Sequence, residues 1–359
     1  MAASRPIKVA VMGLGRAGWN IHVRRMREDK RFVVTSVMDS LRERREQAAE
    51  ELGCAAFGTR KSLLDKTDAE LVVNALPSHL HAPVSIDIMR SGRHCLVEKP
   101  VARTTTECRR MIRAQKSTGK LLFVHQNRRF SPEHKHFTEV IDSGILGRVF
   151  EIKVILSSFS RRNDWQTLKK NNGGVLYNTG SHTVDSVLQL LGSPVADIWG
   201  DTKLISDSGD AEDHAHVIVR AKSGCIADIL VTTSCNADFP FWTICGTCGT
   251  LVSDGRSSTI KYFDPQRVKP LPVEPSAPPD RTYGNADKLP WTEKTVPTPS
   301  RDSYDLYDNV HDVLRRRGKM VVTPESVLEA LRVMETAKKR FQVWRPEYGK
   351  ARKQRTKAK

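Results

Sequence analysis

The chain lacks any apolar run long enough to cross a membrane, and it also lacks the cysteine pattern of a disulfide framework. No stretch approaches the roughly 20 apolar residues that a membrane span needs. The first residues lead into a strand-like run without a signal-peptide core. The seven cysteines are odd in number and scattered through apolar segments, as reduced thiols usually are. These absences predict a cytoplasmic protein with no membrane partner.

Paired metal ligands are missing as well. Cys245 and Cys248 have the spacing of a zinc or redox motif, but no second ligand pair accompanies them. Their surroundings, CGTCGTL, indicate a glycine turn between two strands instead. We therefore predict no metal site.

Negative charge is scarce, because 41 Asp and Glu residues face 58 Lys and Arg residues, which gives a net charge of +17. Six of the last ten residues are basic, and such a block is more typical of a solvated tail than of a nucleic-acid contact. The remaining positive excess suits an anionic dinucleotide. A length of 359 residues with 39% hydrophobic content predicts two domains rather than one core.

Strand-like and helix-like segments alternate through the first third of the chain. Short apolar runs at 7–12, 32–39 and 94–97 are separated by helical patterns, which is the rhythm of a doubly wound parallel sheet. After about residue 127, long alternating runs indicate a largely antiparallel sheet. A proline-rich surface excursion over 265–299 and a late helix over 323–344 follow.

These patterns predict an α/β fold in three parts. A Rossmann dinucleotide-binding domain spans residues 1–127, a substrate-binding α+β domain spans 128–345, and a basic disordered tail spans 346–359.

A G-x-G-x-x-G segment at 13–18 directly follows the first predicted strand. Its glycines permit a tight turn, a close approach of backbone to a pyrophosphate, and close packing of a helix. Asp39 ends the next strand and is expected to accept hydrogen bonds from ribose hydroxyls, which favours NAD over NADP. Arg42 and Arg44 would reverse that preference if they bound a 2′-phosphate. The predicted cofactor-binding residues are Gly13, Gly15, Arg16, Ala17, Gly18, Asp39, Pro77, His81, Glu98 and Lys99.

Two segments carry candidate catalytic groups. Lys99 follows the apolar run 94–97, and since ligands bind beyond the carboxyl ends of parallel strands, it is expected beside the glycine loop. The segment NNGGVLYNTGSHTVD brings Asn178, His182 and Asp185 to a bend and a helix start. His182 is a candidate proton acceptor because imidazole titrates near neutrality. Asp185, three residues further on, is expected to pair with it.

Six segments in this order, MGLGRAG, LVEKPVA, QNRRFSP, IDSGILGRV, GGVLYNTGSHTVD and CGTCGTL, resemble the Gfo/Idh/MocA family over roughly residues 6–345. The resemblance implies a Rossmann domain, a second domain with an open-faced sheet that forms homodimers or homotetramers, and NAD(P)-dependent redox chemistry on sugars, inositols and related polyols. It also implies that Lys99 and His182 act at the nicotinamide beside an aspartate. That aspartate falls on Asn178, whose amide can orient a hydroxyl but cannot accept a proton.

The leading hypothesis is an NAD-dependent oxidoreductase that transfers a hydride between the nicotinamide and a sugar, inositol or polyol carbinol. Lys99 and His182 are its acid–base pair, Asn178 positions the substrate, and Asp185 orients His182. Two alternatives stay open. One is a glycosidase that uses tightly bound NAD transiently, and the other is a noncatalytic NAD-sensing regulatory protein.

Substrate contacts are predicted near the domain junction and before the GG turn. Asn127 and Arg128 would reach cofactor or substrate, or else join an interdomain ion pair. Arg162 and Trp165 would supply a carboxylate clamp and a sugar-stacking face, or else lie in an ordinary exposed loop. An acidic sugar or sugar nucleotide is therefore a candidate substrate.

Overall fold

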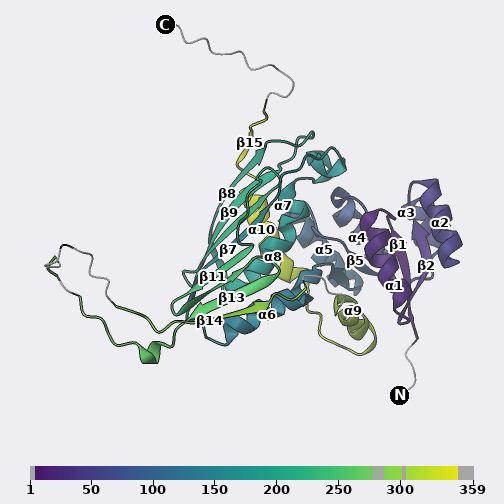
Figure 1. Ribbon diagram of the computed structural model, residues 1–359. Helices are drawn as coiled ribbons and strands as arrows, with labels where there is room; N and C mark the ends of the chain where they lie inside the picture. Colours follow the sequence, from purple (N-terminus) through teal and green to yellow (C-terminus); the bar gives the residue numbers. More distant parts are fainter. Residues whose placement is uncertain (1–4, 274, 278–280, 282–286, 301–304, 347–359) are drawn as a thin grey trace, which may run out of the picture.

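The computed structural model describes residues 5–273, 275–277, 281, 287–300 and 305–346. Two β-sheets organise them, one of six strands in the N-terminal part and one of nine strands in the C-terminal part (Figure 1). The predicted basic tail lies, except for residue 346, outside the described residues. Within the described ranges, no helix has both the length and the apolar character that a membrane span requires.

The first sheet is entirely parallel, with the order β3-β2-β1-β4-β5-β6. Its strands are β1 (Ile7–Met12), β2 (Phe32–Met38), β3 (Ala55–Phe57), β4 (Leu71–Asn74), β5 (His94–Val97) and β6 (Leu122–Val124). Every residue of β4 is buried, as expected of a strand covered on both faces. The strand order reverses between β1 and β4, and a ligand crevice opens at such a switch point. The predicted Rossmann fold is confirmed.

Helices connect these strands and begin or end at recognisable signals. The elements are η1 (Gly18–Val23), α1 (Arg24–Glu28), α2 (Arg42–Leu52), α3 (Arg60–Lys66), η2 (Ser78–Leu80), α4 (His81–Arg90) and α5 (Thr105–Thr118). The helix predicted after the glycine loop begins as the π-helical turn η1 and continues as α1. Helix α5 begins where the Thr104 side chain accepts the amide of Glu107, and it ends at Gly119 in the left-handed conformation.

The second sheet has the order β14-β13-β12-β11-β7-β10-β9-β8-β15. Its strands are β7 (Val149–Ser157), β8 (Val195–Leu204), β9 (His214–Ala221), β10 (Ile226–Thr232), β11 (Trp242–Gly246), β12 (Gly249–Ser253), β13 (Ser257–Tyr262), β14 (Thr292–Pro297) and β15 (Phe341–Val343). The β7–β10 and β8–β15 pairs are parallel and the others antiparallel. Cys245 and Cys248 lie at the β11–β12 hairpin, where the glycine turn was predicted.

Helices cover one face of this sheet. They are α6 (Pro132–Asp142), α7 (Val175–Asn178), α8 (Gly180–Leu191) and α10 (Leu328–Ala337). The short turn η3 (Asn127–Phe130) precedes α6, and η4 (Trp165–Thr167) and η5 (Lys169–Asn171) lie between β7 and α7. On β7, Ile152 and Val154 are buried toward these helices while Glu151 and Lys153 on the other face are half-exposed. Figure 1 shows no helix of the described chain over that other face. The predicted open-faced sheet fits this layering, and the homodimer or homotetramer stays a prediction.

Two predicted segments differ from the structure. The late helix predicted over 323–344 is wrong at both ends, because η7 (Glu325–Val327) precedes α10, and residues 341–343 leave the helix to pair with the edge strand β8. The proline-rich excursion over 265–299 is largely exposed where it is described, but it contains η6 (Pro265–Arg267) and ends in β14, which extends the sheet beside β13.

Helix α9 (Asp305–Arg315) returns the chain to the first sheet, as Figure 1 shows. The Tyr307 hydroxyl lies 3.0 Å from Nδ1 of His22 in η1. Asp308 pairs with Arg31, and Arg315 lies 2.5 Å from the Glu70 carboxylate. The C-terminal part of the chain therefore contributes buried groups directly behind the glycine loop.

Gly18 is the glycine of the motif that packing requires most. A Cβ atom at Gly18 would overlap the carbonyl oxygen of Gly13, whereas a Cβ atom at Gly53 would meet nothing within 4 Å. Backbone cannot yield as a side chain can, so we expect Gly18→Ala to lower the free energy of unfolding by about 3 kcal/mol. Gly53→Ala should lower the free energy of unfolding by only about 1 kcal/mol, because the sole penalty is an alanine in a left-handed backbone conformation. Urea unfolding of both variants measures the difference, and equal losses would contradict the packing argument.

Candidate active site

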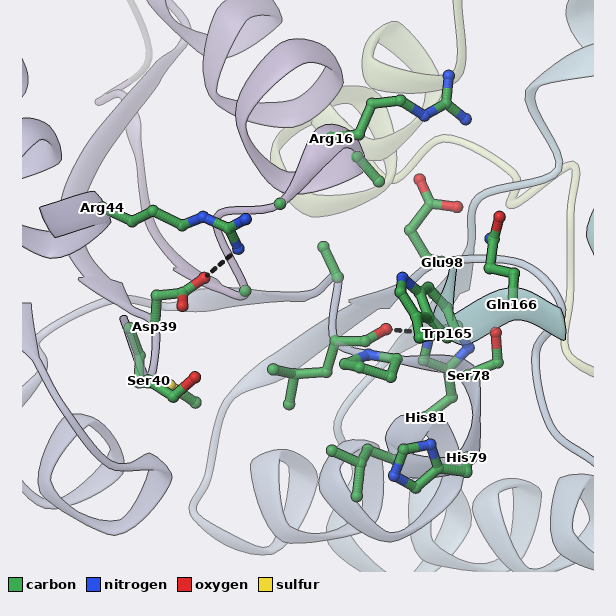
Figure 2. Close-up of a pocket in the computed structure, with 18 of the residues that line it drawn as sticks. Arg16, Asp39, Ser40, Arg44, Ser78, His79, His81, Glu98, Trp165 and Gln166 are labelled. Atoms are coloured by element: carbon green, nitrogen blue, oxygen red, sulfur yellow. Dashed lines mark hydrogen bonds and ion pairs between the residues drawn. The ribbon is translucent and has the colours of Figure 1, made fainter. Parts of the chain in front are cut away.

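A cleft of about 960 Å³ lies where the first sheet faces the loop before α7. Figure 2 shows Asp39 and Arg44 toward one end of it, with Glu98, Trp165 and Gln166 toward the other. The cleft brings together most of the predicted residues. Those in its wall are Gly13, Gly15, Arg16, Ala17, Asp39, Pro77, His81, Glu98, Lys99, Arg162, Trp165 and Asn178. Gly18, Asn127, Arg128, His182 and Asp185 are not in that wall.

The glycine loop forms the floor of the cleft. Gly13 has a φ of +90°, and a Cβ atom there would lie 2.7 Å from the carbonyl oxygen of Ala75. Only glycine satisfies both constraints, so the loop can run close against the end of β4. This is the arrangement in which main-chain amides and a helix start can approach a pyrophosphate.

Asp39 is held at the end of β2 by backbone donors. Its Oδ2 accepts the amide of Leu14 at 2.7 Å, and its Oδ1 accepts the amide of Leu41 at 2.9 Å. The guanidinium of Arg44 lies 3.5 Å from Oδ2 and also lines the cleft. Arg42 instead pairs with Glu46 on the exposed face of α2. Of the two arginines considered from sequence, only Arg44 therefore reaches this corner.

Lys99 lies at the other end of the cleft. Its backbone amide donates to Oε2 of Glu98 at 3.0 Å, and its Nζ donates to the carbonyl oxygen of Asn178 at 2.9 Å. Burial lowers the pKa of the Lys99 ammonium below its ordinary value, and the positive charges of Arg16, Arg128 and Arg162 lower it further, while Glu98 opposes them. An amine with a lowered pKa can both donate to a reacting oxygen and exchange a proton.

His182 lies on α8, near Lys99 but outside the cleft wall. Its Nδ1 is 2.9 Å from Oε1 of Gln126, whose amide nitrogen donates to the carbonyl oxygen of Ser181. The Gln126 oxygen is thus an acceptor, so Nδ1 carries the hydrogen and Nε2 holds a lone pair. Burial lowers the pKa of His182 well below its ordinary value, and the charges of Lys99 and Arg128 add to this effect.

Asp185 does not orient His182, contrary to the sequence-based expectation. Both of its carboxylate oxygens accept from Arg129, at 2.8 and 2.6 Å, and the pair is almost completely buried. Spacing of three residues on a helix permits contact but does not enforce it, and a bidentate arginine from η3 binds the carboxylate more strongly. The residue that orients His182 is Gln126 instead of Asp185.

His81 ties two neighbouring turns together. Its Nδ1 lies 2.6 Å from the carbonyl oxygen of Pro100 and its Nε2 lies 2.9 Å from that of Leu76. The side chain is 1% exposed, so it positions the turn after β4 against the Lys99 turn. His79 lines the cleft nearby.

The loop before α7 closes the cleft from the side of the second sheet. The amides of Gln166 and Asn178 bond reciprocally, at 3.3 Å and 3.2 Å. Arg162 donates to Asp164 and Gln166, and Trp165 lines the cleft with 41% of its surface exposed. Sequence reasoning missed Gln126 and Gln166. Gln126 opens the QNRRFSP segment, but its role depends on the contact with His182, 56 residues away, and Gln166 reaches the site only through its contact with Asn178.

Both parts of the chain match known protein families. Residues 7–126 match the family model described as "Oxidoreductase family, NAD-binding Rossmann fold", and residues 134–252 match that of the GFO/IDH/MocA C-terminal domain. An uncharacterized oxidoreductase of Schizosaccharomyces pombe is 28% identical over 94% of this chain and 97% of its own length. The NADP⁺-dependent scyllo-inositol 2-dehydrogenase of Bacillus subtilis is 24% identical over 92% of each chain.

Solved structures share the fold. An NAD-binding protein from Listeria innocua is 24% identical with a TM-score of 0.78, and it covers 93% of this chain and 96% of its own. The WlbA dehydrogenase from Bordetella pertussis, solved with NADH and UDP-GlcNAcA, is 22% identical with a TM-score of 0.75, over 94% and 97% of the two chains.

The Arg129–Asp185 pair is a structural contact, and its loss should be costly. Asp185→Asn leaves the buried guanidinium without its counter-charge, so we expect the free energy of unfolding to fall by about 3 kcal/mol. Asp197→Asn, in the exposed pair with Arg220, is the matched control and should change it by about 0.5 kcal/mol or less. Urea unfolding provides the measurement, and a small effect at Asp185 would contradict a buried structural role.

Proposed function

The chain belongs to the Gfo/Idh/MocA family of oxidoreductases, and on this basis we propose that it transfers a hydride between NAD and a carbinol of a sugar, inositol or related polyol. One observation carries the proposal: the Lys99 ammonium lines the same cleft as the glycine loop and donates to the Asn178 carbonyl. A donor at that point can meet a substrate oxygen next to the reactive end of a bound dinucleotide.

The residues of the cleft fit a dinucleotide along its whole length. Gly13 and Gly15 let the backbone approach the pyrophosphate, and Asp39 lies at the end of β2 where ribose hydroxyls can donate to its carboxylate. When bound, NAD supplies the hydride acceptor. The protein residues then have to hold the carbinol, stabilise its oxygen and remove its proton.

Lys99 is proposed to stabilise the reacting oxygen. The ammonium has three N–H donors, and the Asn178 carbonyl uses one of them. A second can donate to the carbinol oxygen and favour its alkoxide character as the hydride leaves. The lowered pKa of this buried ammonium also makes its proton more readily exchanged.

His182 is proposed to accept the hydroxyl proton. Gln126 fixes the Nδ1–H tautomer, which leaves Nε2 as the base. Because burial lowers the pKa of His182 well below its ordinary value, the imidazole is neutral at pH 7 and ready to accept a proton. Nε2 would thus take up the hydroxyl proton while the carbinol carbon gives up its hydride, so that a ketone remains.

Asn178 is proposed to position the substrate rather than to exchange protons. Its side-chain amide bonds to Gln166, while its backbone carbonyl accepts from Lys99. Because Asn178 stands where the family resemblance implies an aspartate, the reacting end of the cleft has one carboxylate fewer. The surrounding charges are consequently dominated by cations.

We propose that the substrate is an acidic sugar or sugar nucleotide. The positive charges of Arg16, Arg128 and Arg162 all lower the pKa of Lys99, whereas the Glu98 carboxylate raises it. Such a surplus of positive charge favours an anionic ligand in a narrow cleft. Trp165, at 41% exposure in the cleft wall, offers a face for a sugar ring.

Lys99→Met tests the proposed chemistry. Wild-type enzyme is assayed with NAD and a panel of sugar acids, neutral sugars and inositols, with NADH absorbance as the signal. We expect the variant to lose about 10³-fold in kcat on any accepted substrate, because the reacting oxygen loses its donor. NADH fluorescence titration should give a Kd within about threefold of wild type, since Gly13, Gly15 and Asp39 bind the cofactor independently of Lys99.

Unchanged turnover in Lys99→Met would sink the proposed role of the lysine. A glycoside cleaved by wild type without net NADH would favour the transient-oxidation alternative instead. NADH binding without turnover of any panel member would favour a regulatory protein.

Asp39 is proposed to set the preference for NAD. Its carboxylate would repel a 2′-phosphate, while Arg44, 3.5 Å away, would attract one. Asp39→Asn keeps an acceptor for the Leu14 amide but removes the charge. We therefore expect the ratio of NADPH to NADH affinity to rise about tenfold in this variant. Fluorescence titration with both cofactors gives the ratio, with Arg42→Ala as a control outside the cleft. No rise would contradict the assignment.

A further inference from the structure

A buried cluster of polar side chains adjoins Lys99, and one of its members, Glu98, also reaches the cleft wall. His22 from η1, Glu98 after β5, His125 after β6 and Tyr307 from α9 form this Glu98 cluster, and each is at most 6% exposed. They come from four segments that are far apart in the sequence. Buried polar groups are expensive unless they are satisfied, so such a convergence points to a role.

Hydrogen bonds in the cluster assign its protons. Oε1 of Glu98 lies 3.0 Å from Nε2 of His22 and 3.1 Å from Nδ1 of His125, so each of these nitrogens carries a hydrogen. Nδ1 of His22 is then a lone pair, and it accepts the Tyr307 hydroxyl at 3.0 Å. Both histidines can fill these roles as neutral imidazoles, which leaves the carboxylate as the charge of the cluster.

The Glu98 carboxylate is stabilised in its ionised form. Burial opposes ionisation, but the interactions with His125 and His22, whose ring nitrogens lie 3.1 and 3.0 Å from Oε1, outweigh it and hold the pKa of this carboxyl well below its ordinary value. Burial lowers the pKa of His22, which keeps that imidazole neutral. The remaining oxygen, Oε2, accepts the backbone amide of Lys99 at 3.0 Å.

We propose that His22, His125 and Tyr307 hold the Glu98 carboxylate as a fixed counter-charge behind Lys99, so that all four are positioning residues for the ammonium. Asn178 contributes only neutral donors and acceptors beside Nζ. Glu98 therefore balances a site in which Arg16, Arg128 and Arg162 would otherwise favour a neutral amine. The proposal adds a device to the site and does not depend on which substrate is turned over.

Metal binding would be another use of the same atoms. The ligand atoms of His22, Glu98 and His125 lie within 4.8 Å of one another. The two N···O separations of 3.0 and 3.1 Å are those of hydrogen bonds, and each is explained by an N–H donor and the carboxylate acceptor. The hydrogen-bonded interpretation accounts for the cluster without an ion.

Several other groups act on the two charges at issue. Besides Glu98, the charged groups that shift the pKa of Lys99 are Arg16 beside η1, Arg128 on η3 and Arg162 before η4. The charge of Lys99 in turn lowers the pKa values of His81 and His182. The Glu98 carboxylate has the opposite effect and raises the pKa values of His81 and His182. Substitutions within the cluster are therefore chosen to alter the influence of Glu98 on the pKa of Lys99.

The pKa of Lys99 is the quantity that tests this proposal. It is read by NMR from ¹³C-methylated lysines of the full-length protein, with the Lys99 signal assigned by its loss in Lys99→Arg. Glu98→Gln removes the counter-charge, so we expect the pKa of Lys99 to fall by about one unit or more. Tyr307→Phe removes one hydroxyl at the edge of the cluster and should lower it by a smaller amount.

His311→Gln is the matched control, because His311 is buried on the same helix, α9, but outside the cluster. It should leave the pKa of Lys99 unchanged. NADH titration of every variant establishes that the cofactor site is intact, and Tyr307→Phe keeps the test decisive if Glu98→Gln fails to fold. An unchanged or raised pKa of Lys99 in the folded cluster variants would overturn the proposal. So would one transition-metal ion bound per chain and lost in Glu98→Gln.

Discussion

The balance of charge around the Lys99 ammonium is the constraint on which the rest of the site depends. Burial in the cleft and three arginines favour the neutral amine, while the Glu98 carboxylate behind it favours the charged form. The parallel sheet makes this balance possible because the carboxyl ends of β1, β4 and β5 meet at one edge. The glycine loop and the Lys99 turn therefore line the same cleft.

The second sheet supplies what the first cannot. It carries α7 and α8 on its covered face, and these bring Asn178 and His182 to the Lys99 ammonium. Helix α9 returns Tyr307 to the back of the same turn. The surroundings of Lys99 are thus completed by residues remote in sequence. A change in the packing of either sheet would therefore alter the environment of this one amine.

Local sequence predicts the parts of the site that local geometry enforces. Positions 13 and 18 of the G-x-G-x-x-G segment leave no room for a side chain. An acid at the end of β2 or a lysine after β5 must emerge at the same sheet edge. Gln126 and Tyr307 could not be found this way, because nothing near them in sequence indicates their partners. The expectation for Asp185 failed for the same reason: its arginine partner lies 56 residues away and outweighs its neighbour on the helix. The end of α10 was missed because strand β8 offers an edge that only the folded chain has.

Deuterium transfer from the carbinol carbon tests the account most directly. An accepted sugar acid is labelled with deuterium at that carbon and incubated with NAD and the wild-type enzyme. The account predicts one deuterium in the reduced nicotinamide for each ketone formed, because the hydride moves directly between the two carbons. Deuterium released to water, or product formed without reduced nicotinamide, would contradict it.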